Sequence, residues 1–131
     1  KLLNIKNIFI MKTLTHDNLS YIYNIADFAI ASYPDKDSLF QFGHCPLKIY
    51  DYMYHKLPII FIGNKYNLDI ESAGIFQVKF DNRESFSKII NKVNLMSKDE
   101  LKSIGLINYD CVNRTNSPEN LIKGFNELIF H

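Results

Sequence analysis

The stretch Leu57–Gly63 (LPIIFIG) is almost wholly apolar, and it constrains the fold more than any other part of the chain. A short strand with apolar residues on both faces is typical of the buried centre of a parallel sheet. Further short apolar runs, separated by stretches with helical spacing, predict strands at Asn7–Met11, Phe28–Ser32 and Ile75–Phe80. The last of these is more polar, which favours a place near an edge of the sheet. We therefore expect an α/β fold built on about four parallel strands with flanking helices.

Capping signals predict where the helices begin. Helices are expected to start at Thr15 or Asp17, at Pro46, near Asn67, at the capping boxes Asp81–Glu84 and Ser97–Glu100, and at Ser117. Apolar residues at helical spacing predict the faces that pack inward, namely Leu19, Ile22, Ala26, Phe86, Ile89, Ile90, Val93, Leu101, Ile104, Ile107, Cys111, Leu121, Phe125, Leu128 and Ile129. The connection Tyr33–Cys45 is unusually long, and long loops in compact α/β domains are often functional.

The bulk properties narrow the class of protein. The chain has 131 residues, of which 47% are hydrophobic, so one globular domain with a core is expected. The formal net charge of +1 shows no basic excess of the kind that nucleic-acid binding uses. No apolar run has the length of a membrane span, and no signal peptide is visible. The first residue is Lys and an apolar stretch follows almost at once, so we expect a piece of a longer protein.

The cysteines and histidines do not predict a metal site. Cys45 and Cys111 are far apart, which fits neither a metal pattern nor a disulfide framework, and two unpaired thiols suit a reducing cytoplasm. His44, Cys45 and His55 are close in sequence, but helical spacing separates His55 from the other two by nearly three turns. Cys45 as a nucleophile would need a base and an orienting partner, and neither is visible nearby. We therefore predict no metal and no cofactor.

The segment HCPLKIYDYMYHKLP carries the clearest chemistry. In a helix that begins at Pro46, Lys48 and Asp51 are three residues apart and share a face. Helix N-termini favour anions such as phosphate, and in parallel sheets ligands bind beyond the carboxyl ends of the strands. Lys48 could add positive charge there, and Asp51 could accept hydrogen bonds from vicinal hydroxyls such as those of a ribose. The alternative is a surface Lys–Asp pair, worth about 0.2–0.5 kcal/mol.

Three successive segments resemble the C-terminal domain of GT-B glycosyltransferases, above all the family 4 group, also called glycosyltransferase group 1. The segments are ADFAIASYP, PLKIYDYM and KLPIIFIG, and the similarity spans about residues 8–129. The family pattern has Pro-x-Lys-x-x-Glu-Tyr-Met in a helix, followed by Gly-Lys-Pro and an apolar strand. The resemblance implies that residues 1–131 are a donor-nucleotide-binding domain fragment with a partial Rossmann-like sheet. It also implies that the N-terminal acceptor domain lies outside this chain.

The resemblance assigns roles to individual residues. The backbone at Cys45, Pro46 and Leu47 would meet the diphosphate of the donor, and Lys48 would neutralise it. Asp51 would hold the ribose. His16 is a candidate contact to the nucleobase, and the candidate contacts to the donor sugar are Gln41, Phe42, Gly43 and His44. No catalytic residue is assigned.

Several positions depart from the family pattern. The family usually has Glu where Asp51 stands, and Asp is one methylene shorter. The small residue and the Gly that usually end the helix are replaced by Tyr54 and Lys56, and a non-Gly residue in a left-handed cap position carries some strain. Family 4 members often have an earlier Glu in the preceding loop, where this chain has Gln41 and no acid.

The implied function is transfer of a sugar from a nucleoside-diphosphate donor to a hydroxyl acceptor, in cell-surface polysaccharide or glycan synthesis. This chain alone would be inactive, because the acceptor domain and the first strands of the donor domain are missing. The implied partners are the nucleotide sugar and a glycan or lipid-linked acceptor. A cytoplasmic protein is expected, with peripheral association at the inner face of the membrane as one arrangement that fits. The alternatives are a sugar-nucleotide epimerase of the same fold and a non-catalytic remnant that binds a partner.

Overall fold

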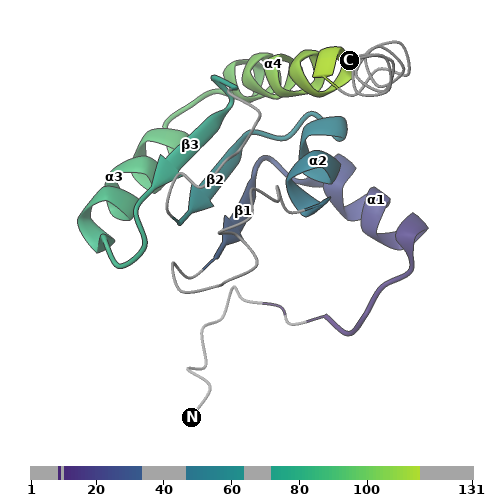
Figure 1. Ribbon diagram of the computed structural model, residues 1–131, viewed down its shortest axis with the longest axis horizontal. Helices are drawn as coiled ribbons and strands as arrows, with labels where there is room; N and C mark the ends of the chain where they lie inside the picture. Colours follow the sequence, from purple (N-terminus) through teal and green to yellow (C-terminus); the bar gives the residue numbers. More distant parts are fainter. Residues whose placement is uncertain (1–8, 10, 34–46, 64–71, 116–131) are drawn as a thin grey trace, which may run out of the picture.

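The computed structural model describes residues 9, 11–33, 47–63 and 72–115 of the chain. Its helices are α1 (His16–Ile25), α2 (Leu47–Tyr54), α3 (Arg83–Asn94) and α4 (Lys98–Thr115), and its strands are β1 (Ala29–Ser32), β2 (Ile59–Ile62) and β3 (Ile75–Val78). The three strands form one parallel sheet in the order β1-β2-β3 (Figure 1). The α/β class, the parallel sheet, the central place of β2 and the edge position of β3 are confirmed.

The described sheet has three strands, where the sequence predicted about four. The missing one is Asn7–Met11: of this segment the structure describes only Phe9 and Met11, and neither is part of a strand. Both side chains are exposed, so they lack the burial against a sheet that would stabilise a short apolar strand. The helices predicted near Asn67 and at Ser117 fall on residues 64–71 and 116–131, outside the described part of the chain.

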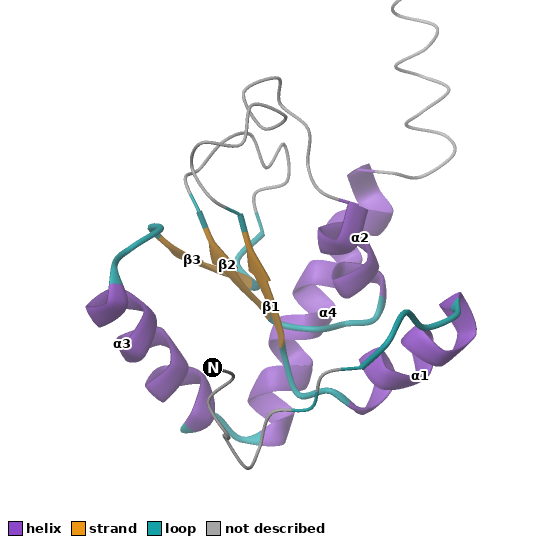
Figure 2. Cartoon of the chain, turned by 90° about the horizontal axis from the view of Figure 1, so that it is seen from below, coloured by secondary structure: helices purple, strands orange, loops and turns teal. Residues whose placement is uncertain are grey.

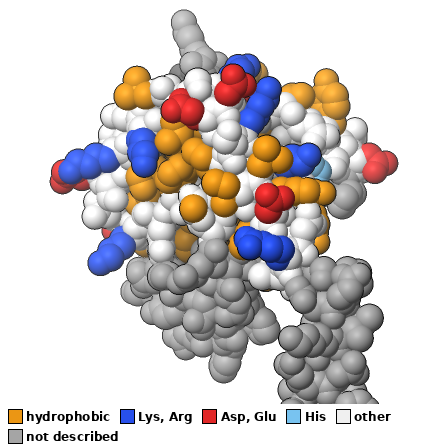
Figure 3. All heavy atoms as spheres, turned by 90° about the horizontal axis from the view of Figure 1, so that it is seen from above, with side chains coloured by type: hydrophobic (Ala, Val, Ile, Leu, Met, Phe, Trp, Pro, Cys, Tyr) orange, Lys and Arg blue, Asp and Glu red, His pale blue; other side chains and the backbone are white. Residues whose placement is uncertain are grey.

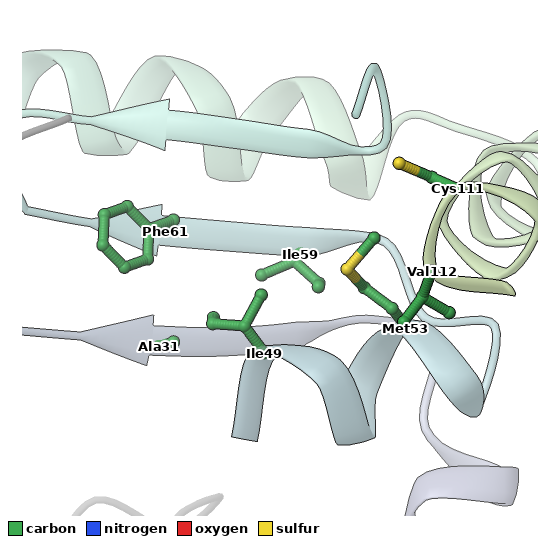
Figure 4. Close-up of a cluster of buried hydrophobic side chains, with 7 residues drawn as sticks. All are labelled: Ala31, Ile49, Met53, Ile59, Phe61, Cys111 and Val112. Atoms are coloured by element: carbon green, nitrogen blue, oxygen red, sulfur yellow. The ribbon is translucent and has the colours of Figure 1, made fainter. Parts of the chain in front are cut away.

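Helices cover both faces of the sheet (Figure 2). Successive side chains of β2 point to opposite faces, and because all of them are apolar, each face needs a cover. Ile59 and Phe61 face α2 and α4, and Ile60 faces α3. On the first face the buried cluster is Ala31, Ile49, Met53, Ile59, Phe61, Cys111 and Val112 (Figure 4). On the second face it is Ile60, Val78, Val93 and Leu101, with Phe86, Ile89 and Ile90 packed against it. The inward face predicted for α3 is therefore confirmed.

Side-chain caps begin three of the helices. Thr15, not Asp17, caps α1 and accepts a hydrogen bond from the N–H of Asn18. The Ser97–Glu100 capping box is confirmed, because the Glu100 carboxylate accepts from the N–H of Ser97 at 2.7 Å and the Ser97 hydroxyl accepts from the N–H of Glu100 at 3.2 Å. The reciprocal bonds satisfy two donors that the first turn of α4 would otherwise leave without partners.

The capping box predicted for α3 at Asp81 and Glu84 is wrong. Asn82 caps this helix, and its side-chain oxygen accepts from the N–H of Ser85 at 2.9 Å. Asp81 lies one residue earlier, in a turn with a φ of 64°, so its carboxylate is out of register with the first turn. Asn and Asp are both good caps, and the turn geometry decides between them.

The turn from α2 into β2 is a Schellman motif, which ends a helix with one left-handed residue. Lys56 has a φ of 57°, its N–H donates to the Met53 carbonyl, and the N–H of Leu57 donates to the Tyr52 carbonyl, both at 3.0 Å. The left-handed cap expected at Lys56 is confirmed. Leu57 is buried, so the motif delivers the chain directly into the central strand.

Helix α4 is fixed to the amino-terminal ends of the strands by Asn108, which is fully buried. Its side-chain amide donates to the carbonyl oxygens of Leu57 at 2.8 Å and Gly74 at 3.1 Å, and its oxygen accepts from the Ser72 hydroxyl. The inward face predicted for α4 is partly wrong, because Ile107 is 45% exposed. Polar contacts to strand ends, which the apolar pattern does not reveal, set the rotation of this helix.

Within the described ranges, no helix combines the length and the apolar character that crossing a membrane requires.

Candidate functional site

The N-terminus of α2 lies at the carboxyl edge of the sheet, where the sequence placed it. Tyr33 directly follows β1, and the Lys48 ammonium lies 5.8 Å from the centroid of its ring. The Tyr33 ring stacks in turn on Phe61 of β2, with 6.0 Å between centroids. Burial of Ile49 and Met53 against the sheet holds α2 in this position and leaves Lys48 exposed. The first turn of α2 is therefore presented at the edge where parallel sheets bind ligands.

Lys48 and Asp51 do not form the surface pair that was the alternative explanation of their spacing. In the described part of the chain no ion pair joins the two side chains, although they share one face of α2. Lys48 is instead placed over the Tyr33 ring, a contact that favours the cation. Asp51 is half-buried and lies one turn further along the helix. A ligand at this edge would thus meet a cation and a carboxylate that do not neutralise each other.

Two tyrosines lie close to Asp51, and sequence reasoning missed both. The rings of Tyr23 and Tyr52 meet edge to face with 5.2 Å between centroids. Burial raises the pKa of Tyr52, and the Asp51 carboxylate raises that pKa further. Burial also raises the pKa of Tyr23, and Tyr52 and Asp51 add smaller contributions. Both phenols therefore stay protonated and can donate hydrogen bonds. Tyr52 follows Asp51 in the chain, but only the packing of α1 on α2 brings Tyr23 to it.

His55 joins α2 to α1 behind this site. Its Nδ1 lies 2.8 Å from the Asp51 carbonyl oxygen, which can only accept, so Nδ1 donates this hydrogen bond. Its Nε2 forms a hydrogen bond of 2.6 Å with the Ser20 hydroxyl. The ring also contacts Tyr23, with 5.0 Å between centroids. Both nitrogens of His55 are occupied by contacts that fix the two helices together.

The remaining predicted site residues divide into two groups. Leu47 is the first residue of α2 and is 81% exposed, and His16 is the first residue of α1. The predictions for the loop and for the helix start fall outside the described residues: Gln41, Phe42, Gly43, His44, Cys45 and Pro46. The structure therefore brings Lys48 to Tyr33 and places Asp51 close to Tyr52 and Tyr23. The sequence could have suggested Tyr33, because it follows a strand at the carboxyl edge.

The charge of the described surface is mixed. On the face seen in Figure 3, acidic and basic side chains alternate with hydrophobic ones, and no single sign dominates. No group of three or more His, Cys, Asp or Glu residues that could hold a metal ion occurs among residues 9, 11–33, 47–63 and 72–115. His44 and Cys45 lie outside these ranges, so the proximity of the pair to His55 is not described.

Comparison with known proteins gave no similarity. No family model matches the chain, and neither does any curated protein or solved structure. The arguments for function therefore come from the residues and the geometry of this chain.

Proposed function

We propose that this chain is the nucleotide-sugar-binding part of a glycosyltransferase, and that the carboxyl edge of its sheet holds the donor. The observation that carries the proposal is the placement of the exposed Lys48 in the first turn of α2, beside the end of β1 and without an ion pair to Asp51. A cation in the first turn of a helix is unfavourable by roughly 0.3–1 kcal/mol. An anionic ligand at this helix end would reverse that cost.

Lys48 would act on the diphosphate. The first N–H groups of α2 have no partners within the helix and would donate to phosphate oxygens. The ammonium would neutralise charge that grows on the diphosphate as the sugar leaves, which is electrostatic stabilisation of a leaving group. This contribution needs no metal.

Asp51 would hold the ribose. One turn beyond Lys48, its carboxylate can accept hydrogen bonds from two vicinal hydroxyls. The protonated phenol of Tyr52 borders the same carboxylate, so a nucleoside could use both groups. The left-handed Lys56 supports the likeness to the family, because it occupies the helix-ending position where the family has Gly. Transfer to a hydroxyl acceptor would require an acceptor domain outside this chain.

The test is calorimetric titration of the protein with UDP, GDP and their sugars. Lys48→Ala should weaken binding of the nucleotide that the protein accepts by about tenfold or more, since a charge-assisted contact is lost. Asp51→Ala should weaken binding of a nucleoside diphosphate but not of inorganic pyrophosphate, which has no ribose. Asp51→Glu, the family residue, should retain binding.

Matched controls are Lys88→Ala on α3 and Asp110→Ala on α4, which remove the same charges elsewhere on the exposed surface. The proposal fails if no nucleotide binds, or if the Lys48 and Asp51 variants bind as tightly as these controls. Binding without sugar transfer by the complete protein would favour the non-catalytic alternative.

A further inference from the structure

A cavity of about 410 Å³ lies at the edge of the sheet opposite to Lys48. Ala26 and Asp27, which precede β1, form one wall, and Leu57 and Pro58, which precede β2, form another. The first two turns of α4 complete it. Every lining residue belongs to the described part of the chain. The cavity therefore lies at the other edge of the sheet from Lys48, because parallel strands place their amino and carboxyl ends at opposite edges. Tyr23, which lies close to Asp51, is one of its lining residues.

Basic side chains dominate the charged lining. Lys56, Lys98 and Lys102 line the cavity, and Asp27 is the acidic residue among the lining groups. Lys98 and Lys102 are four residues apart on α4, so two like charges share one helix face, an arrangement that destabilises an isolated helix. Neither lysine forms an ion pair with a carboxylate in the described part of the chain. A bound anion between the two ammonium groups would remove their repulsion.

Two further polar residues, Tyr23 and His55, line the cavity. His55 lines the cavity, and both of its ring nitrogens are engaged, by the Ser20 hydroxyl and by the Asp51 carbonyl. Tyr23 lines it as well, and its phenol stays protonated because burial raises its pKa. The cavity thus combines ammonium groups with a neutral hydroxyl donor, which is a combination that phosphate oxygens accept.

We propose that this cavity binds the phosphate group of a small phosphorylated molecule, with Lys98 and Lys102 as the principal contacts. Lysine binds phosphate as a point charge, and two lysines on one helix face can contact different oxygens of the same group. The volume falls within the range of about 300–1,000 Å³ that is usual for small-molecule sites, so it can hold more than a phosphate ion. The proposal does not depend on the proposed transferase function.

The test uses amide chemical shifts, which report where a ligand binds. The protein is titrated with inorganic phosphate and, separately, with glycerol 3-phosphate, each at an ionic strength matched with sodium chloride. Saturable shifts are expected at Leu57 and at Lys98–Lys102, with glycerol 3-phosphate binding more tightly if the ester is the true ligand. Equal affinity for both probes would show that the site recognises phosphate alone, and it would overturn the proposal that the ligand is a phosphate ester.

The Lys98→Gln/Lys102→Gln variant should lose these shifts or weaken binding by about tenfold or more, since two charged contacts are lost. Without phosphate, the double variant should have a melting temperature at or above that of the parent, because the repulsion between the two lysines is gone. Such a melting temperature would show that the variant is folded. Lys88→Gln should bind as the parent does. The proposal is overturned if chloride gives the same shifts, if the double variant binds like the parent, or if the shifts centre on Leu47–Ile49.

Discussion

Replacing Asn108 by Ala should destabilise the fold more than almost any other change of similar size. The side chain is fully buried and joins α4 to the carbonyls of Leu57 and Gly74 and to the Ser72 hydroxyl. Alanine can form none of these three bonds. In the variant the Gly74 carbonyl keeps a second hydrogen bond, from the N–H of Ile59 at 3.0 Å. The loss of the Asn108 donor therefore affects the Leu57 carbonyl most.

The magnitude follows from the number of bonds. Each intramolecular hydrogen bond contributes about 0.5–1.5 kcal/mol, so the three bonds of Asn108 contribute roughly 3 kcal/mol. A buried carbonyl left without a donor costs about 1–3 kcal/mol, although some of this overlaps with the lost bond. The expected loss in the free energy of unfolding is therefore about 3–5 kcal/mol. That is a large part of the roughly 5–15 kcal/mol by which a domain of this size is usually stable.

Urea denaturation followed by far-ultraviolet circular dichroism measures this loss. With a slope of about 2 kcal/mol per molar urea, the midpoint should fall by about 2 M. Asn91→Ala, at an exposed position of α3, is the matched control and should change stability by less than about 0.5 kcal/mol. If Asn108→Ala costs less than about 1 kcal/mol at an unchanged slope, the hydrogen bonds of Asn108 do not hold α4 in place, and the reasoning is refuted.

Three further predictions concern the turn from α2 into β2 and the neighbourhood of Asp51. Gly105→Ala should cost at least about 2 kcal/mol in urea denaturation, because a Cβ there would lie 1.8 Å from the Lys56 carbonyl oxygen; an unchanged midpoint would contradict the close packing. Lys56→Gly should raise stability by about 0.5–1 kcal/mol, since relief of the left-handed φ outweighs loss of the contact with the Tyr109 ring at 4.9 Å, whereas Lys56→Ala should lower it. Because burial and Asp51 raise the pKa of Tyr52 in the folded state, the contribution of Tyr52 to stability should be complete below pH 10.0, the ordinary phenol value, and should be lost as the pH rises above it. Phenolate absorbance should show that Asp51→Asn lowers this pKa, and an unchanged titration would exclude the Asp51 contribution.

The candidate site shows which features the spacing of residues can predict and which it cannot. The Pro46 signal and the apolar residues of the following helix predicted α2, and the run of parallel strands predicted which edge its first turn would meet. Lys48 was found in this way, and its position at the end of β1 agrees. The Tyr33 ring beneath Lys48 and the Tyr23 phenol near Asp51 were not predicted, because both contacts join residues of different elements. Neither contact can be derived from the periodic spacing of residues within one helix or strand.

The sequence by itself determined the class of the fold, the apolar centre of the sheet and where most of the described helices begin. These features depend on periodicity and on caps, which act over a few residues: β2 is apolar on both faces, and Ser97 with Glu100 forms its box within one turn. Only the tertiary structure decided the rotation of α4, where hydrogen bonds from Asn108 to strand ends place Ile107 toward solvent. It also decided that Lys48 contacts Tyr33 and forms no ion pair with Asp51, and that Lys98 and Lys102 face a cavity formed by three separate segments. Such contacts depend on how distant segments pack together, and the local sequence carries no record of that packing.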